Sequence, residues 1–181
     1  NDITDVFLYD RLTQLIERVS INNAGEEANA GILGQGSNSP SISADGRFIT
    51  FESDAPNLVP GDNNFRSDIF VYDRLNHQIE LVSVNESEEE GRGPSVQPSI
   101  SADGRFVTFS SFANNLVGGT DNNRRVQDIF VYDRLLKKTS RVSVKDDGSE
   151  DNGIYGAPVI SWDGRYVAFS SSVVFSNKDS L

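Results

Sequence analysis

The sequence predicts an all-β fold, and three observations predict it: short alternating apolar runs, turn-forming pairs between the runs, and recurrence of the whole pattern. The runs are rich in β-branched and aromatic residues, as in Phe-Val-Thr-Phe at 106–109 and Ile-Phe-Val-Tyr at 129–132. Such alternation is typical of half-buried strands. No long stretch keeps a helical period, so we expect almost no helix.

The recurrence shows as two alternating motifs. The first reads PSISADGRFITFES, PSISADGRFVTFSS and PVISWDGRYVAFSS, and it begins at Pro40, Pro98 and Pro158, which are 58 and 60 residues apart. The second reads DVFLYDR or DIFVYDR and begins at positions 5, 68 and 128. Self-similarity at a fixed period of this length indicates tandem structural units. We therefore place three repeats, approximately 1–53, 54–111 and 112–171, in a single domain that covers 1–181.

Each repeat contains four strands, which we label A to D. Asp-Gly pairs at 45–46, 103–104 and 163–164 join strands A and B, because glycine accepts the positive φ of a tight hairpin turn. A second short turn follows each Tyr-Asp-Arg and joins strand C to strand D. A four-stranded antiparallel meander that recurs as sequence copies favours β-propeller blades over a sandwich.

The phase of the repeats predicts an incomplete ring. The chain starts with strands C and D at about 5–21 and finishes with strands A and B at about 158–171, so two complete blades stand between two half-blades. Each half-blade leaves an unpaired strand edge, which invites pairing. Two explanations stay open here: a homodimer whose composite blades complete a six-bladed ring, or a longer chain that supplies the missing blades.

The long connections all fall at one end of the meanders. They are the segments 22–38, 54–67, 85–97, 112–127 and 145–157, and acidic residues concentrate in them. Long loops are functional or mobile in most domains. A negative surface attracts cations or basic partners. The alternative is a solvated loop face that only aids solubility.

A calcium site is the main chemical hypothesis. The loop between strands B and C carries Asp-Asn-Asn before the Asp of strand C, in two copies, and its oxygen-bearing side chains are Asp62, Asn64, Asp68, Asp121, Asn123 and Asp128. Calcium takes about six to eight oxygen ligands, of which each loop could supply three. Against this interpretation, Asn and Asp also cap turns for local reasons. We keep calcium as a candidate cofactor and predict no other.

Composition and isolated residues exclude several function classes. With 16 basic against 27 acidic residues and a net charge of −11, nucleic acid is not expected as a partner. No apolar run approaches the length of a membrane span. There is no Cys, and the one His, His77, is expected to be a solvated turn residue, so no catalytic residues are predicted. Trp162 is expected in the core or at its rim.

The repeated motifs also carry a family resemblance. Pro-Ser-x-Ser-x-Asp-Gly-Arg, followed by Asn-Leu-Val, Asp-x-Asn and Asp-Ile-Phe-Val-Tyr-Asp, resembles the TolB-like bacterial β-propeller repeat, of the Pro-Asp and WD-repeat-like type. It covers nearly the whole chain, although the third copy departs from it at Trp162. The resemblance implies an exported protein, periplasmic or extracellular.

From the resemblance and the loops we expect a non-enzymatic scaffold. It would recognise a protein or cell-surface component through its acidic loop face, with calcium as a candidate for ordering the loops. The alternative is the propeller portion of a larger exported enzyme, associated with a peptidase or a glycosidase, which would be inactive on its own.

Overall fold

The chain forms short strands joined by turns and loops. The structure, a computed structural model, describes residues 2–118, 126–150, 153 and 155–173, and in this part it contains strands and no helix. The strands are β1 (Phe7–Tyr9), β2 (Ile16–Arg18), β3 (Ser37–Ile42), β4 (Phe48–Ser53), β5 (Asp68–Asp73), β6 (Gln78–Leu81), β7 (Ser95–Ile100), β8 (Phe106–Ser111), β9 (Asp128–Asp133), β10 (Lys138–Arg141), β11 (Val159–Ile160) and β12 (Val167–Ala168).

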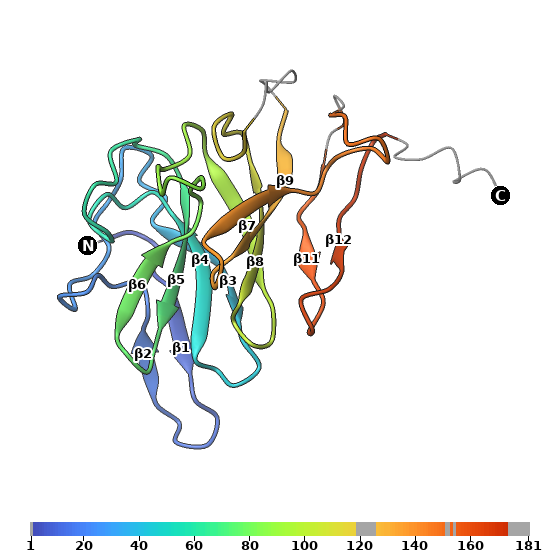
Figure 1. The fold of residues 1–181 in the computed structure, drawn as a ribbon. Coiled ribbons are helices and arrows are strands. Elements are labelled where there is room, and N and C mark those ends of the chain that lie inside the picture. Colours follow the sequence, from blue (N-terminus) through green and yellow to red (C-terminus); the bar gives the residue numbers. More distant parts are fainter. Residues whose placement is uncertain (1, 119–125, 151–152, 154, 174–181) are drawn as a thin grey trace.

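These strands form four separate antiparallel sheets. Strands β3 to β6 and β7 to β10 make two four-stranded meanders, which we call the first and second complete blades. Strands β1 and β2 pair as an N-terminal half-blade, and β11 and β12 pair as a C-terminal half-blade. The two complete blades stand side by side between the two half-blades (Figure 1). The predicted all-β fold and the predicted order of half-blades and blades are confirmed, and the sheets do not close into a ring.

The two complete blades share one register. Strand β4 pairs with β5 from Phe48↔Asp73 to Ser53↔Asp68, and β8 pairs with β9 from Phe106↔Asp133 to Ser111↔Asp128. Equivalent segments of the repeats therefore adopt equivalent shapes, which allows positions to be compared between repeats.

The predicted A–B turns form at the Asp-Gly pairs. Gly104 has a φ of +72°, which side chains rarely adopt. A Cβ on Gly104 would also lie 2.1 Å from the ring of Phe48, so the neighbouring blade requires glycine here as well.

Strand A tolerates a proline because it is an edge strand with a bulge. Pro40 lies in β3, and the pairing of β3 with β4 shifts register between Asn38 and Ser41. Strand β7 shows the same shift around Pro98. Proline lacks the N–H that a central strand needs, so a bulged edge strand is the position that accepts it.

The apolar core lies between neighbouring sheets rather than within one. One cluster joins Ile69 and Val82 of the first complete blade to Phe109 and Phe130 of the second. Another joins Val6 and Val19 of the N-terminal half-blade to the first complete blade. The N-terminal half-blade and the two complete blades thus cover one another's apolar faces, as the blade interpretation predicts.

Arginine–aspartate pairs tie the short-turn end together. Arg47 donates two hydrogen bonds to Asp73, at 2.9 and 2.7 Å, and Arg105 does the same to Asp133, at 3.0 and 2.7 Å. These arginines hold the pKa values of both aspartates below the usual range. Arg134 crosses to the preceding blade, where it lies 2.9 Å from Glu80. These contacts give the repeated Tyr-Asp-Arg motif a structural role at the short-turn end of the blades.

Two isolated residues can now be placed. His77 is exposed in the β5–β6 turn, as expected, and its Nδ1 lies 3.0 Å from the Tyr72 hydroxyl. Trp162 is 76% exposed, so the expectation of core packing was wrong. Trp162 lies in the β11–β12 turn, and the equivalent turn residues Ala44 and Ala102 of the complete blades are exposed and half-buried, respectively. None of the described segments is a long apolar helix of the kind that crosses a bilayer.

Candidate functional site

The long loops gather at the end of the sheets opposite the A–B and C–D turns (Figure 1). They include the B–C loop 54–67 of the first complete blade and the connection 82–94 that leads from it to the second. The exposed acids of this connection include Glu86, Glu88 and Glu89. At least these three of the acidic loop residues expected from the sequence therefore lie exposed at this end of the sheets.

The metal ligands predicted in the first complete blade lie close together. Asn64 Nδ2 donates to Asp68 Oδ2 at 2.7 Å, so two of the three side chains are in direct contact. The Asn64 amide oxygen accepts from the backbone N–H of Arg66 at 2.6 Å, which is the local turn contact weighed against the metal interpretation. Asp62 is 7% exposed, and its Oδ2 is buried with no hydrogen-bond partner in the described part of the chain.

Glu90 belongs to the same cluster although sequence reasoning did not select it. Its carboxylate accepts from the backbone N–H of Asn63, at 3.3 and 3.2 Å to the two oxygens. We call Asp62, Asp68 and Glu90 the Asp62 cluster. Glu90 follows strand D and Asp62 follows strand B, so only the fold brings them together. An acid at the equivalent place after each strand D, at 27, 90 and 150, was the available signal.

The surroundings of the Asp62 cluster disfavour the ionised form of two of its carboxyl groups, Asp62 and Asp68. Burial raises the pKa of Asp68 to about 7, although hydrogen bonds from Ser83 and Asn64 oppose the shift and the charges of Asp62 and Glu90 add to it. Burial, followed by the charge of Glu90, raises the pKa of Asp62 to about 6. The three acids therefore sense one another in a poorly solvated place.

The predicted metal ligands of the second copy differ in that an arginine lies beside the one that the structure describes, Asp128. Asp121 and Asn123 lie outside the described residues. Asp128 is 3% exposed, and its Oδ2 lies 3.6 Å from Nε of Arg141. The same guanidinium contacts Glu150. Here an arginine of the chain itself neutralises the carboxylates.

No preformed metal site is present in the part of the chain that the structure describes, in the sense of three or more His or acidic side chains converging on one point. In the Asp62 cluster, neutral donors occupy the oxygens: Asn64 Nδ2 on Asp68 and the N–H of Asn63 on Glu90. A cation would have to displace these donors.

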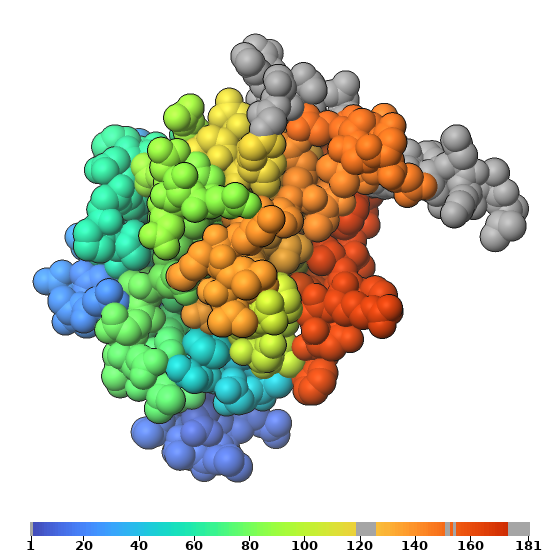
Figure 2. All heavy atoms as spheres, in the orientation of Figure 1, coloured from blue at the N-terminus to red at the C-terminus, as the bar shows by residue number. Residues whose placement is uncertain are grey.

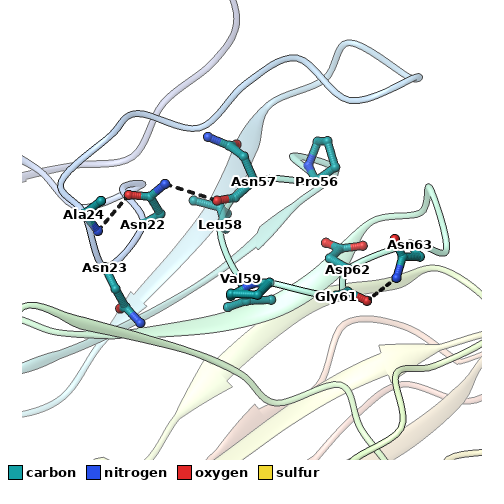
Figure 3. A pocket seen from close by; sticks show the side chains of 11 residues that line it. Asn22, Asn23, Ala24, Pro56, Asn57, Leu58, Val59, Gly61, Asp62 and Asn63 are labelled. Carbon is teal, nitrogen blue, oxygen red and sulfur yellow. Dashed lines mark hydrogen bonds between the residues drawn. The ribbon is translucent and has the colours of Figure 1, made fainter.

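A hollow of about 430 Å³ opens beside the cluster. It is lined by residues 22–24 and 56–63, so it lies between the N-terminal half-blade and the first complete blade (Figure 3). Asn22 Nδ2 donates to the backbone oxygen of Asn57 across it, at 3.3 Å. Because its wall is made of backbone, amide and apolar groups with Asp62 at one side, the hollow offers hydrogen bonds rather than catalytic groups.

Comparisons with known proteins identify the fold. No family model matches the chain, and no curated protein matches it. Among solved structures, the tricorn protease matches with a TM-score of 0.54 and 18% identity over 94% of this chain and 14% of its own. A provisionally assigned TolB of Agrobacterium tumefaciens matches with a TM-score of 0.51 and 15% identity, over 94% and 51%. A prolyl endopeptidase matches with a TM-score of 0.55 and 13% identity, over 92% and 22%.

The fold is that of β-propeller blades. At these identities the likeness shows the fold alone, because propellers support many unrelated activities. The chain spans about half of the Agrobacterium protein and smaller parts of the two peptidases.

Proposed function

We propose that this chain is a non-enzymatic β-propeller module that forms a six-bladed ring with a second copy of itself. In this ring it presents its acidic loop face to a basic protein or cell-surface component. The observation that carries the proposal is the complementarity of the two half-blades. By position in the repeat, β12 and β1 are the strands B and C that would pair in a complete blade.

The complete blades give a template for this pairing. In the shared register, Phe48 opposes Asp73 and Phe51 opposes Phe70. The equivalent residues of the half-blades are Tyr166 opposite Asp10 and Phe169 opposite Phe7. Pairing β12 with β1 would therefore bring Arg165 to Asp10, as Arg105 meets Asp133.

Exposure supports the same pairing. Phe7 is 55% exposed, whereas its equivalents Phe70 and Phe130 are fully buried and stack on phenylalanines of strand B. Tyr9 is also 55% exposed, against 3% for Tyr72. The two half-blades lie at different sides of the complete blades (Figure 2), and in the described chain they form separate two-stranded sheets that do not pair with each other. A second copy with the same two edges would cover both, and six blades fall in the usual range of about four to eight.

The molar mass in solution tests the ring. We expect twice the mass of the 19.9 kDa chain. Arg165→Asp should convert the dimer to monomer, because the acid would face Asp10 across the composite blade. The reversed pair Asp10→Arg with Arg165→Asp should restore the dimer, and Arg11→Glu in the neighbouring exposed turn should leave it intact. A folded wild-type monomer, or a dimer insensitive to Arg165→Asp, would refute the ring.

The loop face is tested with an oligolysine peptide as the basic probe, by fluorescence anisotropy at two salt concentrations. Neutralising Glu86, Glu88 and Glu89 to Gln should weaken binding, since these acids supply the local field. Asp163→Asn, at the opposite end of the sheets, keeps the turn acceptor and should not weaken it. Equal binding by both variants would exclude this face as the basic-partner surface.

A bacterial periplasmic or extracellular location is part of the proposal. It rests on the fold shared with the Agrobacterium protein and on the resemblance of the repeat motifs. Recovery of the chain, expressed from its own gene, in the cytosolic fraction of the organism that carries the gene would contradict it.

A second candidate is the propeller portion of a larger exported enzyme. Two solved structures that share the fold are a protease and a prolyl endopeptidase, of which this chain spans 14% and 22%. In that case the 181-residue chain should be inactive against peptides and glycosides, as under the first proposal. Turnover by this chain alone would overturn both candidates.

A further inference from the structure

Three repeats build the same framework at the start of strand C. An aspartate there accepts a hydrogen bond at Oδ1 from a serine just after strand D: Ser20 Oγ to Asp5 at 2.6 Å, Ser83 Oγ to Asp68 at 2.6 Å, and Ser143 Oγ to Asp128 at 2.8 Å. The second oxygen, Oδ2, is thereby left to face another partner. The repeats differ in what that partner is.

In two of the repeats the partner is an arginine at the end of strand D. Arg18 ends β2, and its Nε lies 3.5 Å from Asp5 Oδ2. Arg141 ends β10 and holds the same position at Asp128, at 3.6 Å. Each guanidinium also contacts a glutamate of the following loop, Glu27 or Glu150. One positive charge therefore bridges two carboxylates in each of these repeats.

In the first complete blade the arginine is replaced by Leu81, which ends β6. The glutamate is still present. The backbone of Glu90 pairs with that of Val84 in a single antiparallel β-bridge, as the backbone of Glu27 pairs with that of Ile21. Asp68 and Glu90 thus keep their places without the guanidinium, and Asp62 adds a third carboxyl. Among the described residues, the other repeats hold two acids around one arginine, whereas this blade holds three acids without the arginine; Asp121, the sequence equivalent of Asp62 in the second complete blade, lies outside the described residues.

Within the ranges that the structure describes, the carboxylate oxygens of Asp62 and Asp68 have few hydrogen-bond donors, and none of these donors is charged. Asp62 Oδ2 is buried with no hydrogen-bond partner in the described part of the chain. Asp68 Oδ2 receives the neutral amide of Asn64, which also donates to the backbone oxygen of Gly91 at 2.9 Å. Buried carboxylates are costly unless a charge or a metal accompanies them. This orphaned oxygen points to a ligand that the chain does not itself supply.

We propose that the Asp62 cluster holds a hard divalent cation, with calcium as the natural candidate, in the place where neighbouring repeats hold an arginine guanidinium. Once the Asn64 amide and the Asn63 N–H are displaced, Asp62, Asp68 and Glu90 would supply carboxylate oxygens, and backbone oxygens such as that of Gly91 would add to them. Hard cations prefer such oxygen sets over any other donors. The site extends the sequence prediction by Glu90, and it is independent of ring closure and of the loop-face partner.

The site is tested by calcium titration of the chelator-treated 181-residue chain, followed by thermal unfolding and calorimetry. Calcium is added as its chloride up to about 10 mM, because extracellular calcium modules bind at about 0.1 to 1 mM. We expect the wild type to bind one equivalent at this cluster and to gain several degrees in Tm, since a ligand of the folded state stabilises it. Leu81→Arg should abolish both effects by placing a guanidinium there.

Asp62→Asn serves as a second variant if Leu81→Arg does not fold, and it should weaken calcium binding roughly tenfold or more through the lost ligand charge. Glu86→Gln is the matched control, because Glu86 is an exposed acid of the same connection and its loss should leave binding unchanged. Absence of any calcium effect in the wild type would overturn the proposal. So would equal binding by the wild type, Leu81→Arg and Asp62→Asn.

Discussion

The two complete blades share strand register, turn glycines and a stacked phenylalanine pair, yet they balance buried charge differently at the long-loop end. In the second blade Arg141 lies between Asp128 and Glu150. In the first blade Leu81 takes the arginine position while Asp68 and Glu90 remain. The comparison teaches that one backbone arrangement can balance buried carboxylates in two ways: with an arginine of the chain or, by our proposal, with a bound metal cation.

The largest expected effect comes from removing the internal cation. Arg141→Leu would leave Asp128 and Glu150 together without their guanidinium, and breaking a buried pair in this way costs about 3 to 5 kcal/mol. Urea unfolding in the presence of a chelator measures the loss. Because the variant copies the arrangement of the first blade, calcium should recover part of it. A loss below about 1 kcal/mol would mean that the arginine does not control this cluster.

The pH dependence is the next effect. The raised pKa values of Asp62 and Asp68 contribute stability that is present below pH 4 and is lost as pH rises through about 6 to 7. Without calcium, the wild type should therefore gain stability relative to Leu81→Arg as pH falls from 7 to 4, by on the order of 2 kcal/mol.

Chelator-treated wild type and Leu81→Arg, unfolded in urea at several pH values, give this difference directly. The groups that face one another are Asp62 of the B–C loop, Asp68 of β5 and Glu90 of the following connection. With calcium present the wild-type gain should disappear, because the cation competes with protons for the same oxygens. A difference that does not change with pH would contradict the raised pKa values.

A smaller effect is expected from Leu81→Arg at neutral pH without calcium. The guanidinium should raise the free energy of unfolding by about 1 kcal/mol, because Leu81 is half-buried and part of the gain is offset by ordering the longer side chain. Chemical denaturation at pH 7.5 in chelator tests this. If the folded variant were less stable than the wild type, the acids of the Asp62 cluster would not need a positive charge in the apo protein.

Much of the fold could be predicted because the repeat presents each signal three times. The Asp-Gly turns, the strand order and the phase of the half-blades follow from local periodicity and turn chemistry, and the structure confirms them. Trp162 was misplaced because it lies in the A–B turn rather than on a covered strand face; the equivalent Ala44 is exposed even in the first complete blade, which has a neighbouring sheet on each side.

The candidate site was predicted less completely. Asp62 and Asp68 share a loop and its adjoining strand, so their spacing could be read from the sequence. Glu90 lies in another connection, and its approach to Asn63 depends on how the B–C loop folds over the next connection. The decisive signal was a difference between repeats, Leu81 where the others have Arg18 and Arg141, rather than a motif within one.

The central claim, that a cation takes the arginine's place in the first complete blade, is tested most directly by paramagnetic broadening. Manganese at low stoichiometry is added to the isotope-labelled chain, and amide and carboxyl signals are followed by NMR. The account predicts that signals of Asp62, Asp68 and Glu90 broaden first while those of Asp128 and Glu150 keep their intensity. Equal broadening of both clusters, or broadening confined to the exposed acids Glu86, Glu88 and Glu89, would contradict it.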